Sequence, residues 1–326
     1  MESFTRHPAL SEFDLIARYF TRAPRHTTLA VGDDAALFSV SPGCELAAST
    51  DMLVEGVHFF PDVDPQALGH KALAVNLSDL AAMGAMPRWA MLSLALPDVD
   101  VQWLEGFSRG FFALADKHDV DLIGGDTTRG PRNICVQIMG EVRQGRALRR
   151  DGAKIGDDIW VSGQLGDAAA AVAQRRGELK LEAPAVERCR LRLDWPAPRV
   201  ALGLALSALA HSAIDLSDGL LGDLGHICER SGVGAEVGYP AVPCSADLAP
   251  LRDHAQGMRA ILAGGDDYEL CFTAAPERAA GIEALATTLD LALTRIGRIV
   301  EGNAVTVFDA AGRPLPVKDK GFDHFR

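Results

Sequence analysis

The stretch from Asp64 to Gly84, DPQALGHKALAVNLSDLAAMG, has the length of a helix and apolar residues on nearly every side. A helix of this composition is buried, and Asp79 lies within its apolar part. A buried carboxylate without a partner is costly, so we expect an Arg or Lys side chain or a metal ion beside Asp79. The stretch therefore predicts a piece of the core and indicates a functional site.

Helical and extended patterns alternate on both sides of this helix. In the first half, the sequence predicts strands at Trp89–Leu96 and Asn133–Val142 and a helix at Val101–His118. In the second half it predicts strands at Ile159–Gly163 and Tyr268–Thr273, helices at Asp167–Arg176 and Pro276–Thr288, and an extended region at Leu291–Phe308. It also predicts a long helical stretch at Pro198–Glu229, which is interrupted at Asp215–Gly219. This mixture predicts an α/β (α+β) fold with two mixed α/β domains.

The length and one change of composition predict where the domains join. A chain of 326 residues is longer than most single hydrophobic cores support. The segment Gly145–Asp158, GRALRRDGAKIGDD, is charged and glycine-rich, which is typical of a connection between domains. We therefore predict an N-terminal domain at 1–147 and a C-terminal domain at 148–326.

The charge balance restricts the partners. The chain has 44 Asp and Glu against 32 Lys and Arg, a net charge of −12. This sign argues against nucleic acids and anionic membranes, which both bind basic surfaces. The first residues lack a signal-peptide pattern and no apolar run reaches membrane-spanning length, so we expect a cytoplasmic protein.

Many Asp residues stand next to small or hydroxyl residues. The segments are VGDDAAL (31–37), STDMLVEGVHF (49–59), GGDTTRG (124–130), DLSDGL (215–220) and GGDDYEL (264–270). Carboxylate and hydroxyl oxygens are the ligands that Mg²⁺ prefers. Taken singly, each Asp is more often a helix cap or a turn residue. For GGDTTRG both interpretations stay open: a plain turn, or bare backbone and a carboxylate that meet a charged ligand.

The common phosphate-binding loops are missing. The sequence has no Walker A motif, no protein-kinase motifs and no dinucleotide-binding glycine pattern. A nucleotide-binding protein of this sequence would have to hold the triphosphate through metal ions, which also suits its acidic composition.

Taken together, the motifs resemble the thiamine-monophosphate kinases, a family in the aminoimidazole ribonucleotide synthetase-like superfamily. Further blocks that carry the resemblance are FDLIARYF (13–20), KALAVNLSDLAAMGA (71–85), SGQLGDAAA (162–170) and GFDHF (321–325). The similarity covers nearly the whole chain. It implies two mixed α/β domains of the superfamily type, with N-terminal sheets that pair in a homodimer.

The resemblance also implies an activity and its residues. The reaction is the ATP-dependent phosphorylation of thiamine monophosphate to thiamine diphosphate with several Mg²⁺ ions, by direct in-line transfer of the γ-phosphate. The implied metal ligands are Asp34, Ser49, Thr50, Asp51, Asp79, Asp126, Asp215 and Asp218. The implied ATP contacts are Gly125, Asp126, Arg150 and Ser217, and the implied substrate contacts are His58, Asp266 and Phe322. No residue is expected to act as a general base, and Asp126 and Arg150 are expected to be the most sensitive positions.

One position departs from the family pattern, and two alternatives stay open. Where the pattern has Glu, this chain has Asp266, whose carboxylate is one methylene shorter. Whether it reaches the substrate directly is therefore open. One alternative is another ATP-dependent enzyme of the superfamily, one that cyclises a ribonucleotide or phosphorylates selenide. The other is a non-catalytic protein that binds a nucleotide or a metal ion.

Overall fold

The computed structural model describes residues 11–317 and 321–322. It divides into two compact units. The first comprises the residues through Pro42 with Ala48–Asn76 and Pro87–Gly140, and the second comprises Gly43–Ala47, Leu77–Met86 and the residues from Glu141 onward. Within the described ranges, none of the helices combines the length and the apolar composition needed to cross a bilayer.

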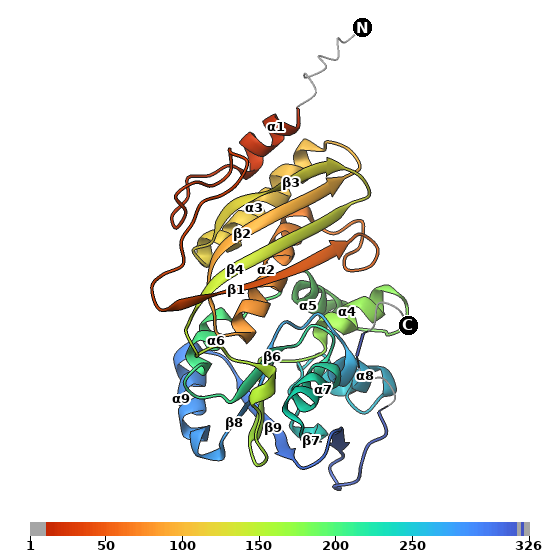
Figure 1. Cartoon of the computed structure of the whole chain (residues 1–326). Helices are drawn as coiled ribbons and strands as arrows, with labels where there is room; N and C mark the ends of the chain where they lie inside the picture. Colours follow the sequence, from red (N-terminus) through yellow and green to blue (C-terminus); the bar gives the residue numbers. More distant parts are fainter. Residues whose placement is uncertain (1–10, 318–320, 323–326) are drawn as a thin grey trace. The chain divides into compact units, whose positions relative to one another are not determined.

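A four-stranded sheet with the strand order β1-β4-β2-β3 forms the framework of the first unit (Figure 1). Its strands are β1 (Cys44–Val54), β2 (Met86–Leu96), β3 (Asp121–Arg129) and β4 (Asn133–Arg143). The helices here are α1 (Glu12–Leu15), followed by the π turn η1 (Ile16–Phe20), α2 (Pro65–Ala82) and α3 (Val101–Lys117). The start of β1, the first residue of β2, the end of β4 and the end of α2 are counted in the second unit. Strands β2 and β3 run parallel and are connected through α3. Helices α2 and α3 lie on the same face of the sheet, so the core of this unit lies between that face and the two helices.

Aromatic side chains fill this core. Trp89 of β2 and Phe107 and Phe111 of α3 are all almost completely buried. The rings of Trp103 and Phe107 stack with centroids 4.9 Å apart. Helix α3 begins where the Asp100 carboxylate accepts hydrogen bonds from two main-chain N–H groups of the first turn.

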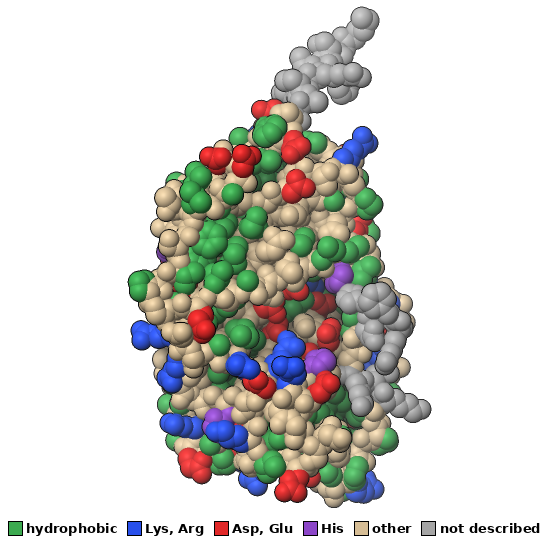
Figure 2. Space-filling view, viewed as in Figure 1, with side chains coloured by type: hydrophobic (Ala, Val, Ile, Leu, Met, Phe, Trp, Pro, Cys, Tyr) green, Lys and Arg blue, Asp and Glu red, His purple; other side chains and the backbone are tan. Residues whose placement is uncertain are grey.

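The opposite face of the sheet carries none of the first unit's helices that lie within the described residues. Side chains alternate along a strand, so every second residue of β1 and β4 points to this face. Leu46 and Met52 of β1 are 45% and 53% exposed there, and Cys135 and Met139 of β4 are half-buried. Hydrophobic side chains gather over these strands in Figure 2. We call this surface, defined by Leu46, Met52, Cys135 and Met139, the open sheet face.

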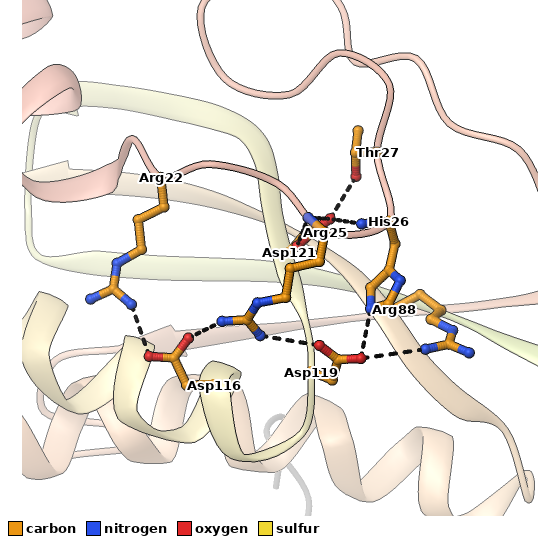
Figure 3. Close-up of polar contacts among 8 residues, drawn as sticks. All are labelled: Arg22, Arg25, His26, Thr27, Arg88, Asp116, Asp119 and Asp121. Carbon is orange, nitrogen blue, oxygen red and sulfur yellow. Dashed lines mark hydrogen bonds and ion pairs between the residues drawn. The ribbon is translucent and has the colours of Figure 1, made fainter.

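A polar network fixes the segment that leads to Asp34. The Asp121 carboxylate accepts hydrogen bonds from the main-chain N–H groups of Arg25 and His26 and from the Thr27 hydroxyl (Figure 3). Ion pairs join the segment and β2 to the end of α3: Arg22–Asp116, Arg25–Asp116, Arg25–Asp119 and Arg88–Asp119. Nε2 of His26 also lies 2.8 Å from Oδ2 of Asp119. The guanidinium of Arg22 also lies over the Phe112 ring, 3.7 Å from its centroid. These contacts fix the residues from 22 to 27 on the first unit.

The second unit is built around a mixed six-stranded sheet with the order β10-β7-β9-β5-β8-β6. The strands are β5 (Asp158–Ser162), β6 (Ser212–Asp215), β7 (Gly234–Gly238), β8 (Leu270–Ala274), β9 (Leu293–Val300) and β10 (Val305–Phe308). The helices are α4 (Asp167–Arg175), α5 (Ala183–Asp194), α6 (Val200–Leu206), α7 (Leu220–Ser231), α8 (Ala255–Ala263) and α9 (Ala279–Leu289). Short 3₁₀ turns lie at Arg150–Gly152, Tyr239–Ala241, Ala249–Leu251 and Pro276–Arg278. Helix α7 packs against β6, β7, β8 and β10.

The two-sheet architecture confirms the predicted mixed α/β fold. One predicted element was wrong in part: the helical stretch Pro198–Glu229 contains the strand β6 between α6 and α7. Four residues are too few for a period-2 pattern to stand out between two helices. The pairing of β6 with β8, which is distant in sequence, makes this segment a strand.

Candidate active site

The residues at the end of β1 point to two different faces. The main-chain N–H of Asp51 donates to Oδ1 of Asn76 on α2 at 3.1 Å. The Thr50 hydroxyl donates to the main-chain oxygen of Val136 at 3.1 Å and lies 3.5 Å from Sγ of Cys135. Thr50 therefore turns its side chain to the open sheet face, while Ser49 and Asp51 turn theirs to the helix-covered face. The three adjacent side chains do not converge.

His58 closes the turn that follows β1. The main-chain N–H of Val54 donates to Nδ1 of His58 at 3.0 Å, and the main-chain N–H of His58 donates back to Val54. A ring nitrogen that accepts a hydrogen bond carries no proton, so the neutral ring has its proton on Nε2. This pair of hydrogen bonds fixes the orientation of the His58 ring.

The segment GGDTTRG is part of a strand rather than a turn. Strand β3 continues through it, with Gly125 opposite Leu92 and Asp126 opposite Ser93 of β2. Gly125 has φ 149°, and a Cβ there would lie 1.7 Å from the main-chain oxygen of Leu92. The bare backbone of Gly125 therefore serves the close approach of β2 and β3. Asp126 itself is exposed.

Asp51 and Asp126 lie on opposite edge strands of the same sheet. Strands β4 and β2 separate β1 from β3, and neighbouring strands are about 4.8 Å apart, so the two residues are roughly 14 Å apart across the sheet. One sheet does not bring them to a common metal ion.

The second unit joins the end of α2 to the end of β6. The Ser78 hydroxyl, which is completely buried, donates to Oδ2 of Asp215 at 2.8 Å. Asp215 is 4% exposed, and Asp79, the neighbour of Ser78, is half-buried. This hydrogen bond brings two elements that carry predicted metal ligands together.

A crowded group of carboxylates follows β6. The main-chain N–H groups of Asp218 and Gly219 donate to Oδ2 of Asp223 in the first turn of α7. Burial and the nearby negative charge of Asp218 raise the pKa of Asp223 to about 7, although these hydrogen bonds and the positive charge of Arg150 counteract them. Arg150 is exposed, in the 3₁₀ turn Arg150–Gly152, which packs against α7. The structure thus places Arg150 where its charge reaches the Asp218 loop.

The loop before β8 and the C-terminal segment meet this same loop. The main-chain N–H of Asp266 donates to the oxygen of Ser217 at 2.9 Å, and that of Phe322 donates to the oxygen of Asp218 at 3.0 Å. The Phe322 side chain is 50% exposed. Ser217, Asp218, Asp266 and Phe322 are therefore neighbours in the second unit. The rest of the GFDHF block, 323–325, lies outside the described residues.

Asp34 lies in an exposed loop of the first unit. Its main-chain N–H donates to Oδ1 of Asp33 at 2.8 Å, so the Asp33 carboxylate supports the turn. Within the part of the chain that the structure describes, no group of three or more His, Cys, Asp or Glu side chains is placed to hold a metal ion.

Sequence reasoning missed three residues that the structure places among these. Ser78 contacts Asp215, Asp223 contacts the Asp218 loop, and the hydroxyl of Tyr268 donates to Oδ1 of Asp266 at 3.1 Å. Ser78 and Tyr268 lie inside motifs that sequence reasoning used, next to residues it did select. Asp223 had one available signal, because it is an Asp in the first turn of a predicted helix.

Comparisons with known proteins agree on one family. The chain matches AIR synthase related protein, N-terminal domain, over residues 32–142 and AIR synthase related protein, C-terminal domain, over residues 154–310. It is 46% identical over 321 residues to the thiamine-monophosphate kinase of Escherichia coli (strain K12), with 97% of this chain and 99% of that protein covered.

Two solved structures are similar along most of the chain. The crystal structure of thiamine-monophosphate kinase from Stenotrophomonas maltophilia K279a has a TM-score of 0.82 and 51% identity, and the match covers 90% of this chain and 94% of that one. The structure described as AaThiL complexed with AMPPCP and TMP has a TM-score of 0.77 and 34% identity, and the match covers 91% and 92%.

Proposed function

The chain belongs to the thiamine-monophosphate kinases of the AIR synthase related family, and from that premise we propose how its residues carry the reaction. It is an enzyme that uses ATP to phosphorylate thiamine monophosphate to thiamine diphosphate. The observation that carries this conclusion is 46% identity over 97% of the chain. The relative complexed with AMPPCP, an ATP analogue, and TMP supports both substrates.

The acceptor needs no general base. A phosphate monoester has its second pKa near 6, so at pH 7 it is mostly a dianion and already nucleophilic. The barrier lies in bringing this anion in line with an anionic triphosphate and in stabilising the charge that is transferred. We infer direct transfer of the γ-phosphate without a phosphoenzyme. The protein supplies positioning and cationic groups, among them Arg150.

The donor set fits magnesium. The proposed ligands offer carboxylate and hydroxyl oxygens: Asp34, Ser49, Asp51, Asp79, Asp126, Asp215 and Asp218, with Thr50 contributing through its main-chain oxygen because its hydroxyl is bonded to Val136. Burial and then the negative charge of Asp218 raise the pKa of Asp223, and a cation would relieve such crowding. When bound, magnesium supplies charge neutralisation between the two phosphate-bearing substrates.

The remaining roles follow the chemistry of the side chains. For ATP we propose the main chain at Gly125, the Asp126 carboxylate through metal, Arg150 and Ser217. For thiamine monophosphate we propose His58, Asp266 and Phe322. The hydrogen bond from Val54 holds the His58 ring at the end of β1, and an exposed aromatic such as Phe322 can stack on a heteroaromatic ring.

We further propose that the enzyme is a homodimer that pairs through the open sheet face. Leu46 and Met52 of β1 are 45% and 53% exposed there, and none of the described helices of the first unit covers this face. Contiguous exposed apolar surface of this kind marks interaction sites, and a second copy would cover it symmetrically. We also propose a domain join near residue 148, and an ATP-consuming reaction supports the cytoplasm as the location.

Mass-resolved product analysis tests the function. Purified protein is incubated with ATP and Mg²⁺ and with thiamine monophosphate, free thiamine, an aminoimidazole-pathway ribonucleotide or selenide. We expect thiamine diphosphate and ADP from the monophosphate. Turnover of the ribonucleotide or of selenide instead would favour a sister enzyme. ATP binding without ADP release under all conditions would favour a non-catalytic nucleotide-binding protein.

A further inference from the structure

The segment Gly264–Tyr268, between α8 and β8, holds two residues in a strained backbone conformation. Asp266 has φ 68° and Tyr268 has φ 50°. The left-handed region is uncommon for Asp and is an outlier for a bulky residue such as Tyr. Strain of this kind persists where surrounding contacts determine it, often at functional sites.

Main-chain hydrogen bonds fix the segment on the loop that follows β6. The N–H of Asp266 donates to Ser217 at 2.9 Å, and the N–H of Tyr268 donates to Leu216 at 2.8 Å. Immediately afterwards the main-chain oxygen of Glu269 accepts from Leu216 at 2.8 Å. The Glu269 carboxylate, 7% exposed, forms an ion pair with Arg199. The C-terminal end of the segment is thus anchored on the unit's core.

Asp267 anchors the segment from the other side. Both of its carboxylate oxygens accept from the main-chain N–H of Gly166, at 3.0 Å each, where α4 begins. Burial raises the pKa of Asp267 well above its usual range. With Asp267 turned toward α4, its two neighbours are held in the left-handed conformation.

The side chains of Tyr268 and Asp266 contact each other on this anchored segment. Tyr268 is 8% exposed, and its hydroxyl donates to Oδ1 of Asp266 at 3.1 Å. The ring is held by its burial, so the hydroxyl is a fixed donor. A side chain with few rotatable bonds and a fixed partner is pre-organised, which lowers the entropy lost when a ligand binds.

We propose that Tyr268 is a positioning residue that fixes the Asp266 carboxylate for the acceptor substrate. The inference rests on the proposed function and specifies how the substrate end of the site is built. Thiamine carries a cationic thiazolium ring and an amino group, and a carboxylate held in one orientation complements either. In this chain the shorter Asp side chain therefore acts through its orientation, which the strained segment and the Tyr268 hydroxyl set together.

The first test removes the hydroxyl alone. Tyr268→Phe keeps the ring, and loss of one hydrogen bond to a carboxylate should raise the KM and the calorimetric Kd for thiamine monophosphate about fivefold or more. We expect kcat and the KM for ATP to stay within about twofold of wild type. The matched control is Tyr239→Phe, because the Tyr239 hydroxyl donates to the main-chain oxygen of Arg252 at 2.6 Å in the same unit. The control should leave all four quantities unchanged.

The second test asks whether Tyr268 acts through Asp266. Asp266→Gly removes the carboxylate and suits a φ of 68°. Adding Tyr268→Phe to Asp266→Gly should then raise the Kd for thiamine monophosphate no further. A further rise similar to that of the single variant would overturn the proposal, as would an unchanged Kd in Tyr268→Phe. If the wild-type protein makes no thiamine diphosphate, the proposed function fails instead, so the two failures are distinct.

Discussion

At the scale of single residues, Gly125 allows two main chains to approach where a side chain would collide with one of them. A Cβ at Gly125 would lie 1.7 Å from the Leu92 oxygen, whereas a Cβ at Gly124 meets only the flexible end of Met91, at 3.5 Å. We therefore expect Gly125→Ala to lower the free energy of unfolding by about 2 kcal/mol or more and Gly124→Ala by less than about 1. Denaturant titrations of the two variants check this, and equal effects would contradict it.

Substitution of the neighbouring Asp126 tests the proposed chemistry rather than the fold. The side chain is exposed on β3, so Asp126→Asn should leave the melting temperature unchanged. If the carboxylate holds a metal ion on ATP, the substitution should lower kcat/KM at least about 100-fold and raise the Mg²⁺ concentration needed for half-maximal rate. Asp98→Asn, at another exposed position, is the control. Unchanged activity and magnesium dependence in Asp126→Asn would remove it from the site.

The acidic motifs could be identified from the sequence, but the directions in which their side chains point could not. Asp215 and Asp79 stand out because Asp is unexpected beside small and apolar residues. The orientation of Thr50 toward Val136 depends on side-chain alternation along β1, which the motif alone does not indicate. The contacts Ser78–Asp215 and Tyr268–Asp266 depend on tertiary packing and on left-handed backbone at non-glycine residues, neither of which propensity reveals.

At the scale of elements, the end of α3 places His118 where protonation of its ring is unfavourable. Nε2 of His118 is buried without a hydrogen-bond partner among the described residues. Burial first, and then the positive charges of Lys117 and His70, lower the pKa of His118 to about 4. Between pH 6.5 and 4 the unfolded chain therefore binds a proton that the folded chain does not, so this group's contribution to stability is lost as the pH falls.

Replacement of His118 should remove that pH dependence. When the pH is lowered from 7.5 to 5, the free energy of unfolding should decrease by about 1–2 kcal/mol less in His118→Phe than in wild type. Urea titrations at both pH values measure this. His226→Phe, on the exposed face of α7, serves as the control. The same loss in His118→Phe as in wild type would show that His118 does not titrate in this way.

Long, periodic elements were predictable and short ones were not. Helix α3 was predicted as Val101–His118 and is Val101–Lys117, because its cap and its apolar stripe are local signals. Strand β4 was predicted as Asn133–Val142 and is Asn133–Arg143. The strand β6 is four residues long and depends on pairing with β8, so it was absorbed into a helical prediction.

At the scale of the whole molecule, the proposed pairing through the open sheet face can be tested by placing a charge on it. If two copies pair through it, a charge at Met52, which is 53% exposed on β1, should separate them. By light scattering we expect wild type to have twice the 34.7 kDa chain mass and Met52→Glu to have the chain mass itself. Ile155→Glu, at a residue 59% exposed in the second unit, should remain a dimer. A monomeric wild type would refute the pairing, as would a Met52→Glu variant that stays dimeric.

The most direct measurement is a single turnover with ATP labelled on the γ-phosphate, with enzyme in excess over thiamine monophosphate. Direct in-line transfer predicts that the label moves from ATP to the terminal phosphate of thiamine diphosphate and that none is trapped on denatured protein at any time. Label that appears on the protein before the product would contradict direct transfer. Label that stays in ATP or passes only to inorganic phosphate would contradict the kinase activity itself.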